Sequence, residues 1–345
     1  MSDTSSEHLP LPLFLAVQRL PSVQHSRSRV TFASRSVTLP SVSLELPELR
    51  TIDLDGPVSF REWDGPSDTT FVCVHGLGAS HLSWVQVAPA LAGLGRVLAL
   101  DLPGFGHTPL AGRSAGLMDL RRTLSAFMAA FMAASISEKG RGRVVLSGNS
   151  MGGVLSILQA AVEPSSVDAM VLTDPAMPWT RGGWPHPAIM LAFALYDAPR
   201  VGEALVGARL RRLDAESSVR IGLSMIAADR RSIPDDVVQL LVDLYRERAN
   251  DPDAVTAFLA TARSLLRLGK RPATARRALD AVACPVLLLH GRRDRFVPAD
   301  FAEAELARHP DWRGRFFPDL GHAPQMEAPG RWLTEVADWY AGTLE

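Results

Sequence analysis

The clearest sign of chemistry in this 345-residue chain is Ser150, at the centre of the pentapeptide Gly148-Asn149-Ser150-Met151-Gly152. An apolar run at residues 144–147 precedes it and a helical pattern at residues 153–162 follows, so the pattern predicts a strand, a sharp turn and a helix. Such a turn strains the serine backbone, and the glycines leave room that larger side chains would fill. The turn would lift the Ser150 hydroxyl above a sheet edge as a candidate nucleophile.

A serine hydroxyl is a weak nucleophile at neutral pH, so it needs a general base, and the base needs a third group to orient it. Of the nine histidines, His322 fits the role of base best, because it lies in a turn-rich stretch at residues 318–324. A strand-like run at residues 315–317 precedes this stretch and an amphipathic pattern at residues 329–340 follows it. A loop histidine placed there can reach over a sheet edge, whereas the simpler alternative is a surface histidine without a role.

Two aspartates compete for the third position. Asp294 follows the buried-strand pattern and glycine turn at residues 287–291, and Asp174 follows the apolar run at residues 171–173. Both positions fall at the carboxyl ends of strands, where reacting groups collect in parallel sheets. Asp294 is favoured, because the chain order serine, aspartate, histidine is the one expected of this elbow architecture. The other aspartate would be a helix cap or the partner of a nearby arginine.

Acyl transfer also needs hydrogen-bond donors for a developing oxyanion. The backbone N–H of Met151, directly after the candidate nucleophile, is positioned to be one of them. The second is expected from the turn at residues 75–78, where Leu77 is the predicted donor. A further turn with proline and glycine, at residues 101–107, falls at the same edge, and we expect structural support from it rather than catalysis.

The order of the predicted elements indicates an α/β fold. Strand-like runs recur between helical stretches, which favours a mostly parallel sheet with helices on both faces. These runs fall at residues 58–62, 70–74, 97–100, 144–147, 170–173 and 285–290. Only helical patterns occur at residues 176–280, which reads as a cap inserted into a core of residues 50–175 and 281–345. Residues 1–49 are rich in Ser and Pro without a sustained period, so we expect an irregular arm.

The ordered set of motifs closely resembles the α/β-hydrolase superfamily over roughly residues 50–345. The motifs are His75-Gly76-Leu77-Gly78, Asp101-Leu102-Pro103-Gly104-Phe105-Gly106, Gly148-Asn149-Ser150-Met151-Gly152-Gly153, Gly291-Arg292-Arg293-Asp294 and Gly321-His322. The resemblance implies a triad of Ser150, His322 and Asp294. It also implies a mainly parallel eight-stranded sheet with a helical cap after the sixth strand, and no cofactor or metal.

Within the superfamily, the elbow is similar to that of hydrolases that cleave carbon–carbon bonds in ring-fission products of aromatic degradation. The oxyanion loop of those enzymes usually reads Ser-Gly-Pro-Gly, whereas this chain has Gly76-Leu77-Gly78-Ala79. Haloalkane dehalogenases and epoxide hydrolases carry an aspartate at the elbow, so Ser150 argues against both chemistries. The remaining classes are carboxylesterases, thioesterases, lactonases and cofactor-free perhydrolases.

Aromatic side chains at the start of the predicted cap offer a limited clue to the substrate. Trp179, Trp184 and Phe193 are candidates to line an apolar pocket above Ser150. The alternative is that they pack the cap onto the core. A pocket lined by two or more of them would suit a medium acyl chain or a ring, that is, a small and apolar substrate.

The composition indicates no charged macromolecular partner. The formal net charge is −1 and 47% of the residues are hydrophobic, so no overall attraction to nucleic acid or anionic lipid is expected. The apolar stretch at residues 9–20 contains two prolines and no Lys or Arg precedes it, which argues against a secretory signal. The apolar run at residues 126–136 is too short to span a bilayer. A cytoplasmic protein is therefore expected, of unspecified oligomeric state.

Three functional hypotheses follow. The leading one is a serine hydrolase that cleaves a small carboxylester, thioester or lactone through an acyl-enzyme. The second is a carbon–carbon bond hydrolase of a dienoic ring-fission product, which would turn over simple nitrophenyl esters only weakly. The third is a non-catalytic receptor or scaffold on the same fold, against which the complete set of Ser150, Asp294 and His322 speaks.

Overall fold

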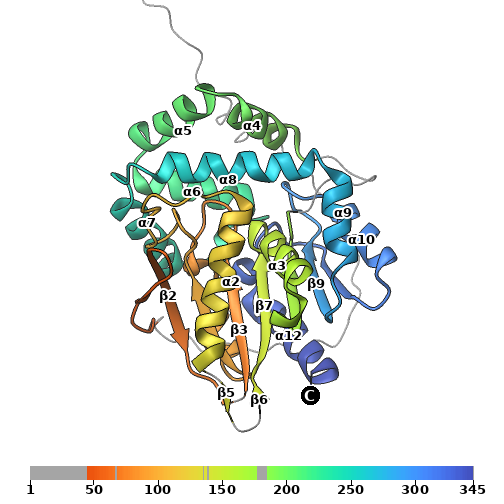
Figure 1. Cartoon of the computed structure of the whole chain (residues 1–345). Coiled ribbons are helices and arrows are strands. Elements are labelled where there is room, and N and C mark those ends of the chain that lie inside the picture. Colours follow the sequence, from red (N-terminus) through yellow and green to blue (C-terminus); the bar gives the residue numbers. More distant parts are fainter. Residues whose placement is uncertain (1–44, 67, 135, 138–139, 177–184, 345) are drawn as a thin grey trace, which may run out of the picture.

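An eight-stranded sheet forms the centre of the computed structural model, which describes residues 45–344 apart from 67, 135, 138–139 and 177–184 (Figure 1). The strand order is β1-β2-β4-β3-β7-β8-β9-β10. The strands are β1 (Arg50–Asp53), β2 (Pro57–Trp63), β3 (Thr69–Val74), β4 (Arg96–Leu100), β7 (Arg143–Asn149), β8 (Ala169–Thr173), β9 (Val286–Gly291) and β10 (Arg313–Phe317). β1 with β2 and β2 with β4 pair antiparallel, and all other neighbours in this sheet pair parallel. The prediction of a mostly parallel eight-stranded sheet is confirmed.

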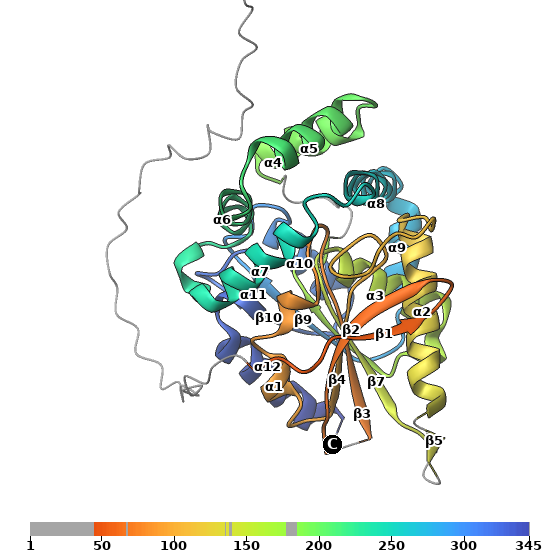
Figure 2. The ribbon, with the colours of Figure 1, turned by 90° about the vertical axis from the view of Figure 1, so that its left-hand side faces the viewer.

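Alternating side chains of the central strands supply two separate cores, one on each face of the sheet. Val72 and Val74 of β3 belong to one buried cluster, whereas Phe71 and Cys73 belong to the other. This period of two is what a strand covered on both faces requires. The helices α2 (Leu117–Ala134), α3 (Met151–Val162) and α10 (Ala299–Arg308) cover the first face. The short helix α1 (Ala88–Leu91) and the long helix α12 (Pro329–Thr343) cover the second (Figure 2).

Between β8 and β9 the described residues form six α-helices, as the helical pattern predicted. They are α4 (Pro187–Asp197), α5 (Val201–Arg212), α6 (Ala215–Ile226), α7 (Asp235–Glu247), α8 (Ala254–Gly269) and α9 (Pro272–Asp280), with the single turn η4 (Arg230–Ser232) before α7. Figures 1 and 2 show α8 crossing one end of the sheet, with α4 and α5 beyond it. A helical cap is therefore present, and its limits at residues 176 and 280 remain a prediction.

Close contacts identify the end of the sheet that the cap covers. A Cβ on Gly78, in the turn after β3, would lie 3.3 Å from the Phe258 ring of α8. A Cβ on Gly104, after β4, would lie 2.3 Å from Cβ of Ala257 on the same helix. Both turns follow the carboxyl ends of their strands, so α8 lies over the edge where reacting groups are expected.

The strand β1 and the N-terminal arm differ from the other predicted segments. The strand β1 was not anticipated, because its four residues are too short to show a period of two. The predicted N-terminal arm lies outside the described residues except for residues 45–49, which form neither helix nor strand. In the part of the chain that the structure describes, no helix combines the length and apolar character needed to cross a bilayer.

Candidate active site

Ser150 lies at the junction of β7 and α3 with φ 55° and ψ −115°, a backbone conformation that is unusual for a residue with a side chain. Its amide donates to the carbonyl oxygen of Thr173 at 3.0 Å, which holds the turn against β8. A Cβ added to Gly148 would lie 2.4 Å from the carbonyl oxygen of Gly152, and one on Gly152 would lie 2.0 Å from that of Val74. The strand–turn–helix arrangement predicted for the pentapeptide is therefore present, and it requires both glycines.

Asp294 and His322 meet at the same edge of the sheet. Asp294 lies in the turn after β9, and His322 lies in the loop between β10 and the short helix α11 (Pro324–Glu327). Nδ1 of His322 is 2.6 Å from Oδ2 of Asp294, and both side chains are almost fully buried. A carboxylate oxygen only accepts, so this contact places the ring proton on Nδ1 and leaves Nε2 as the basic nitrogen.

The backbone fixes the Asp294 carboxylate from its other side. Oδ1 accepts hydrogen bonds from the amides of Phe296 at 2.7 Å and Val297 at 3.1 Å. Burial alone would raise the pKa of Asp294, but the charge and hydrogen bond of His322 outweigh it, so the pKa lies below its ordinary value. The carboxylate is consequently ionised at neutral pH. The ring of Phe296 also stacks on the His322 imidazole, with centroids 4.9 Å apart.

Asn149 joins the histidine loop to the elbow. Its Nδ2 donates to the carbonyl oxygens of His322 at 3.0 Å and Thr173 at 3.1 Å. Among the described residues, neither the Ser150 hydroxyl nor Nε2 of His322 has a hydrogen-bond partner. Both groups are thus left available, and hydrogen bonds of this kind commonly tighten only when substrate is bound.

Asp174, the rival aspartate, is fully buried next to Asp294 and does not contact Nδ1 of His322 as Asp294 does. Its Oδ1 instead accepts from the amide of Gly291 at 2.9 Å. Burial and the negative charge of Asp294 raise the pKa of Asp174 well above its usual value. The geometry therefore gives the histidine contact to Asp294.

The predicted oxyanion donors lie on either side of the elbow. Met151 is the first residue of α3, so its amide has no acceptor within the helix. The Leu77 amide likewise lacks an acceptor among the residues described. The turn that carries Leu77 is shaped by His75, whose Nδ1 donates to the carbonyl of Gly76 at 2.8 Å and whose Nε2 accepts from the amide of Leu102 at 3.1 Å.

Glu327 is a residue of the site that the sequence did not reveal. Its Oε1 accepts from the amides of Gly321 at 2.9 Å and Ala323 at 3.4 Å, the two neighbours of His322. Its Oε2 accepts from the amide of Ala228, in the cap, at 2.7 Å. One carboxylate thereby ties the histidine loop to the cap. The signal in the sequence is only a glutamate five positions after a histidine, which says nothing until the loop conformation is known.

The candidate pocket residues are placed only in part. Trp179 and Trp184 lie outside the described residues. Phe193 is on α4, with its ring centroid 5.9 Å from that of Tyr196, which in turn lies 5.3 Å from that of Phe258. Since Phe258 faces the turn at Gly78, Phe193 is separated from the oxyanion turn by two aromatic contacts.

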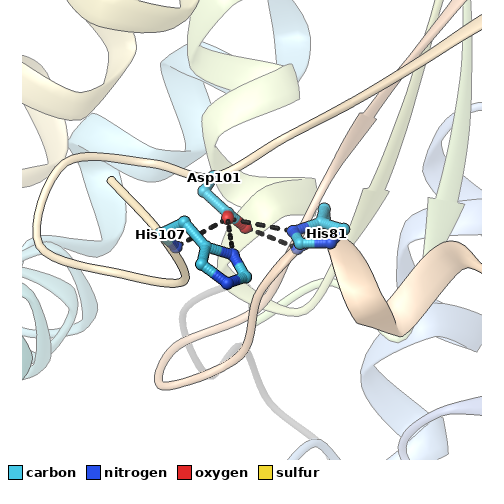
Figure 3. A group of neighbouring side chains, drawn as sticks. All are labelled: His81, Asp101 and His107. Carbon is cyan, nitrogen blue, oxygen red and sulfur yellow. Dashed lines mark hydrogen bonds and ion pairs between the residues drawn. The ribbon is translucent and has the colours of Figure 1, made fainter. Parts of the chain in front are cut away.

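A second group of histidines and aspartate lies at the same edge (Figure 3). Asp101 and His107 belong to the turn predicted to be structural, and His81 begins the 3-10 turn His81–Trp84. Asp101 is fully buried and accepts from the backbone amides of His81 at 2.7 Å and His107 at 2.8 Å. Its Oδ2 is also 2.9 Å from Nδ1 of His81. Nε2 of His81 accepts from Nε of Arg61 at 3.0 Å, so Nδ1 must carry the ring proton. A metal ion would need the Nδ1 lone pair, so the group does not fit a metal site.

Comparison with known proteins identifies the fold family. A sequence model described as the alpha/beta hydrolase fold matches residues 69–329, which is most of the chain. The chain belongs to the α/β-hydrolase fold family. This membership confirms the resemblance drawn from the motifs and supports a hydrolase.

Two curated relatives and one solved structure illustrate the range within this α/β-hydrolase family. The chain is 26% identical over 293 residues to a 2-hydroxy-6-oxononadienedioate/2-hydroxy-6-oxononatrienedioate hydrolase of Cupriavidus pinatubonensis, covering 83% of this chain and 92% of the relative. It is 27% identical over 275 residues to a pimeloyl-[acyl-carrier protein] methyl ester esterase of Aeromonas hydrophila, covering 79% and 94%. The crystal structure of wild-type Cfl2 from Burkholderia cenocepacia shares the fold with a TM-score of 0.70, at 22% identity over 87% of this chain and 97% of that one.

Proposed function

We propose that this α/β-hydrolase is a serine hydrolase that cleaves a small ester-like substrate, a carboxylester, thioester or lactone, through an acyl-enzyme. Ser150 is the nucleophile, His322 the general base and Asp294 the group that orients the histidine. The observation that carries the proposal is the 2.6 Å contact from Nδ1 of His322 to Asp294, beside a serine held at φ 55° on the elbow. Asn149, which bonds to the His322 carbonyl, keeps the two halves of the site together.

The proposed reaction uses Nε2 of His322 and Oγ of Ser150, neither of which has a hydrogen-bond partner among the described residues. Nε2 of His322 takes the proton of Ser150 as Oγ attacks the substrate carbonyl carbon, and then delivers that proton to the leaving group as the carbonyl–heteroatom bond breaks. Water repeats the sequence on the acyl-enzyme and releases the acid. Asp294, anionic and fixed by two backbone amides, stabilises the imidazolium that forms in each step.

The amides of Leu77 and Met151 are proposed as donors to the oxyanion of each tetrahedral intermediate. Neither amide has an acceptor in the turn or helix that carries it or elsewhere in the described part of the chain, which supports a role toward a substrate oxygen. Loss of one such donor typically costs about 10²–10³-fold in turnover. We extend the proposal to the pocket, where Trp179, Trp184 and Phe193 would give an apolar lining within a cap of residues 176–280. This assignment fits a medium acyl chain or a ring.

A carbon–carbon bond hydrolase is the second candidate. The observation that favours it is the likeness to relatives named as hydrolases of 2-hydroxy-6-oxononadienedioate, together with the elbow Gly148-Asn149-Ser150-Met151-Gly152-Gly153. The ester reading is supported by the named methyl ester esterase. Both reactions would use the same three side chains, so the substrate decides between them.

We also propose a cytoplasmic location, which cell fractionation would test.

The deciding experiment measures hydrolysis of nitrophenyl esters of rising acyl length by the wild type and by Ser150→Ala. Activity that peaks at one chain length and disappears in the variant supports a serine esterase and sizes its pocket. Activity that survives in Ser150→Ala contradicts the assignment of the nucleophile. If the wild type hydrolyses none of the esters, the ester reading fails. A dienoic ring-fission product then separates the carbon–carbon hydrolase from a non-catalytic protein.

A further inference from the structure

Two aspartates, rather than one, lie behind His322. Asp174 follows β8 and Asp294 follows β9, and these strands are parallel neighbours with Thr173 paired to Leu289. Their carboxyl ends therefore deliver both side chains to one point. A carboxylate oxygen of each aspartate and a ring nitrogen of His322 all lie within 4.8 Å of one another.

Asp174 is held in place by more than packing. It is fully buried and its backbone has φ 44°, which is unfavourable for a residue with a side chain. Its amide donates to the Leu289 carbonyl at 2.9 Å, and its Oδ1 accepts from the Gly291 amide at 2.9 Å. Oδ2 is buried and accepts no N–H from any residue that the structure describes. One oxygen of this carboxyl is thus left without an ordinary donor.

The remaining partner of Asp174 is Asp294. One oxygen of each carboxyl group lies within 4.8 Å of the other, and the second oxygen of Asp174 has no donor among the described residues. A hydrogen bond between the two carboxyl groups requires one proton between them. Two ionised carboxylates in contact and out of water repel each other strongly, so the pair retains a proton at neutral pH. The oxygens of Asp294 already accept from two amides and from Nδ1 of His322, which favours the charge on that residue.

The other titratable groups near the pair support this placement of the proton. Nε2 of His290 is 3.5 Å from Oδ1 of Asp174 and 3.7 Å from Oδ2 of Asp294, but it donates to the Val297 carbonyl at 3.0 Å. Burial lowers the pKa of His290, so this ring is neutral and supplies no positive charge to Asp174. The charge of Glu327 acts on Asp174 in the same direction as that of Asp294 and disfavours ionisation.

We propose that Asp174 is a positioning residue of the catalytic site: it is held as a neutral carboxylic acid that donates a hydrogen bond to Asp294. It fixes the Asp294 carboxylate against His322 and takes over the negative charge when Asp294 is replaced by a neutral group. The proposal rests on the proposed function, because it assigns Asp294 to the orientation of His322.

A double-mutant cycle on kcat/KM tests this role with the four proteins wild type, Asp174→Asn, Asp294→Asn and the double variant. An amide at position 174 still donates to Asp294, so the single Asp174→Asn variant should lose about tenfold or less. Asp294→Asn should lose about 10²-fold, because an ionised Asp174 remains behind the new amide. The double variant holds neither carboxylate and should lose on the order of 10⁴-fold.

The pH profile separates positioning from a purely structural role. In Asp294→Asn, activity should rise with pH as Asp174 loses its proton. This pH-dependent rise should be absent in the double variant, which has no carboxyl group at either position. Asp101→Asn, a substitution at another buried aspartate of this edge, is the matched control and should change activity per folded molecule equally in both backgrounds. If the double variant is no less active than Asp294→Asn, the role of Asp174 is disproved.

A spectroscopic measurement on the wild type covers the case in which Asp174→Asn does not fold. Carbon-13 NMR of protein labelled at the aspartate carboxyls should show one buried carboxyl that stays protonated at pH 7. Two ionised carboxylates at this point would overturn the proposal. The measurement needs no turnover, so it stands even if no ester is hydrolysed and the proposed function fails.

Discussion

Two groups of histidine and aspartate lie at the same edge of this sheet, and they differ in what their histidines have left to offer. In the group of His81, Asp101 and His107, both ring nitrogens of His81 are occupied, one by Asp101 and the other by Arg61. In the group of Asp294 and His322, Nδ1 is the one ring nitrogen that bonds to a residue the structure describes. A histidine–aspartate contact therefore does not by itself mark a catalytic site, and the free outer nitrogen makes the difference.

The surroundings of the two aspartates differ in the same sense. Asp101 accepts from two amides and from His81, and the charges and hydrogen bonds of its histidines outweigh burial and keep its pKa far below the ordinary value. Asp294 instead shares its burial with a second carboxyl, Asp174. The first group is satisfied and should contribute stability. The second keeps two carboxyl groups buried side by side and, among the described residues, an unpaired ring nitrogen, which is the arrangement expected where function takes precedence over stability.

Replacing the two histidines by alanine should separate the groups most strongly. His322→Ala removes the general base and should lower kcat per folded molecule by on the order of 10⁶-fold. His81→Ala should retain kcat per folded molecule, because His81 touches no reacting atom. Steady-state kinetics corrected for the folded fraction checks both. Similar losses of kcat in the two variants would break the distinction between the groups.

Replacing the two aspartates by asparagine should destabilise the protein more in the Asp101 group than in the Asp294 group, the reverse of the order expected for kcat. Asp101→Asn leaves the donors of His81 and the two amides facing a neutral group, and it should cost about 3–5 kcal/mol of unfolding free energy. In Asp294→Asn the neighbouring carboxyl of Asp174 can take over the negative charge that faces His322, so the cost should be smaller. Urea unfolding of both variants at pH 7 measures the difference. A larger loss for Asp294→Asn would show that Asp294 is the structural member.

Glu327 offers a subtler way to sharpen the comparison, because it anchors the loop of His322 as Asp101 anchors its own loop. Glu327→Gln keeps one acceptor oxygen and loses the second, so either the bond to Ala228 or those to Gly321 and Ala323 are given up. We expect a fall in kcat of about tenfold, equivalent to the loss of roughly one hydrogen bond to a charged group. Glu305→Gln, a buried glutamate remote from this loop, is the control, and an equal fall in kcat there would argue against the anchoring role.

The main elements of the fold could be predicted from the sequence because their signals lie in short local segments. The strand runs and the glycines of the elbow can be read from neighbouring residues, and the order of Ser150, Asp294 and His322 follows from their positions along the chain. Contacts between distant elements could not be read in this way. The bond from Asn149 to the His322 carbonyl depends on how β7 and a later loop approach each other, and no pattern near either residue encodes it.

The contact between Asp174 and Asp294 could not be predicted for the same reason, because it joins elements that are distant in the sequence. From the sequence, Asp174 and Asp294 are competitors for one role, since each follows a strand at the correct edge. The parallel pairing of β8 with β9 brings the two carboxyls together. Their shared proton is a consequence of that register and of burial, neither of which is a property of a local segment.

The smallest expected effect concerns His107, where the Asp101 group reaches the cap. Nε2 of His107 is 3.0 Å from Oε2 of Glu247 on α7, and the Asp101 carboxylate, whose Oδ2 lies 3.6 Å from Nδ1 of His107, is the main reason that the pKa of His107 lies above its ordinary value. A raised pKa means that the stabilisation is complete below the pKa of the unfolded chain, about 6.5, and is lost as pH rises through the folded value. Because Glu247 is 61% exposed, solvent screens its share, which should be below about 1 kcal/mol. Urea unfolding between pH 6 and 9 should show wild type and Glu247→Gln converging as pH rises, and a constant difference would mean that Glu247 acts through packing rather than through the charge of His107.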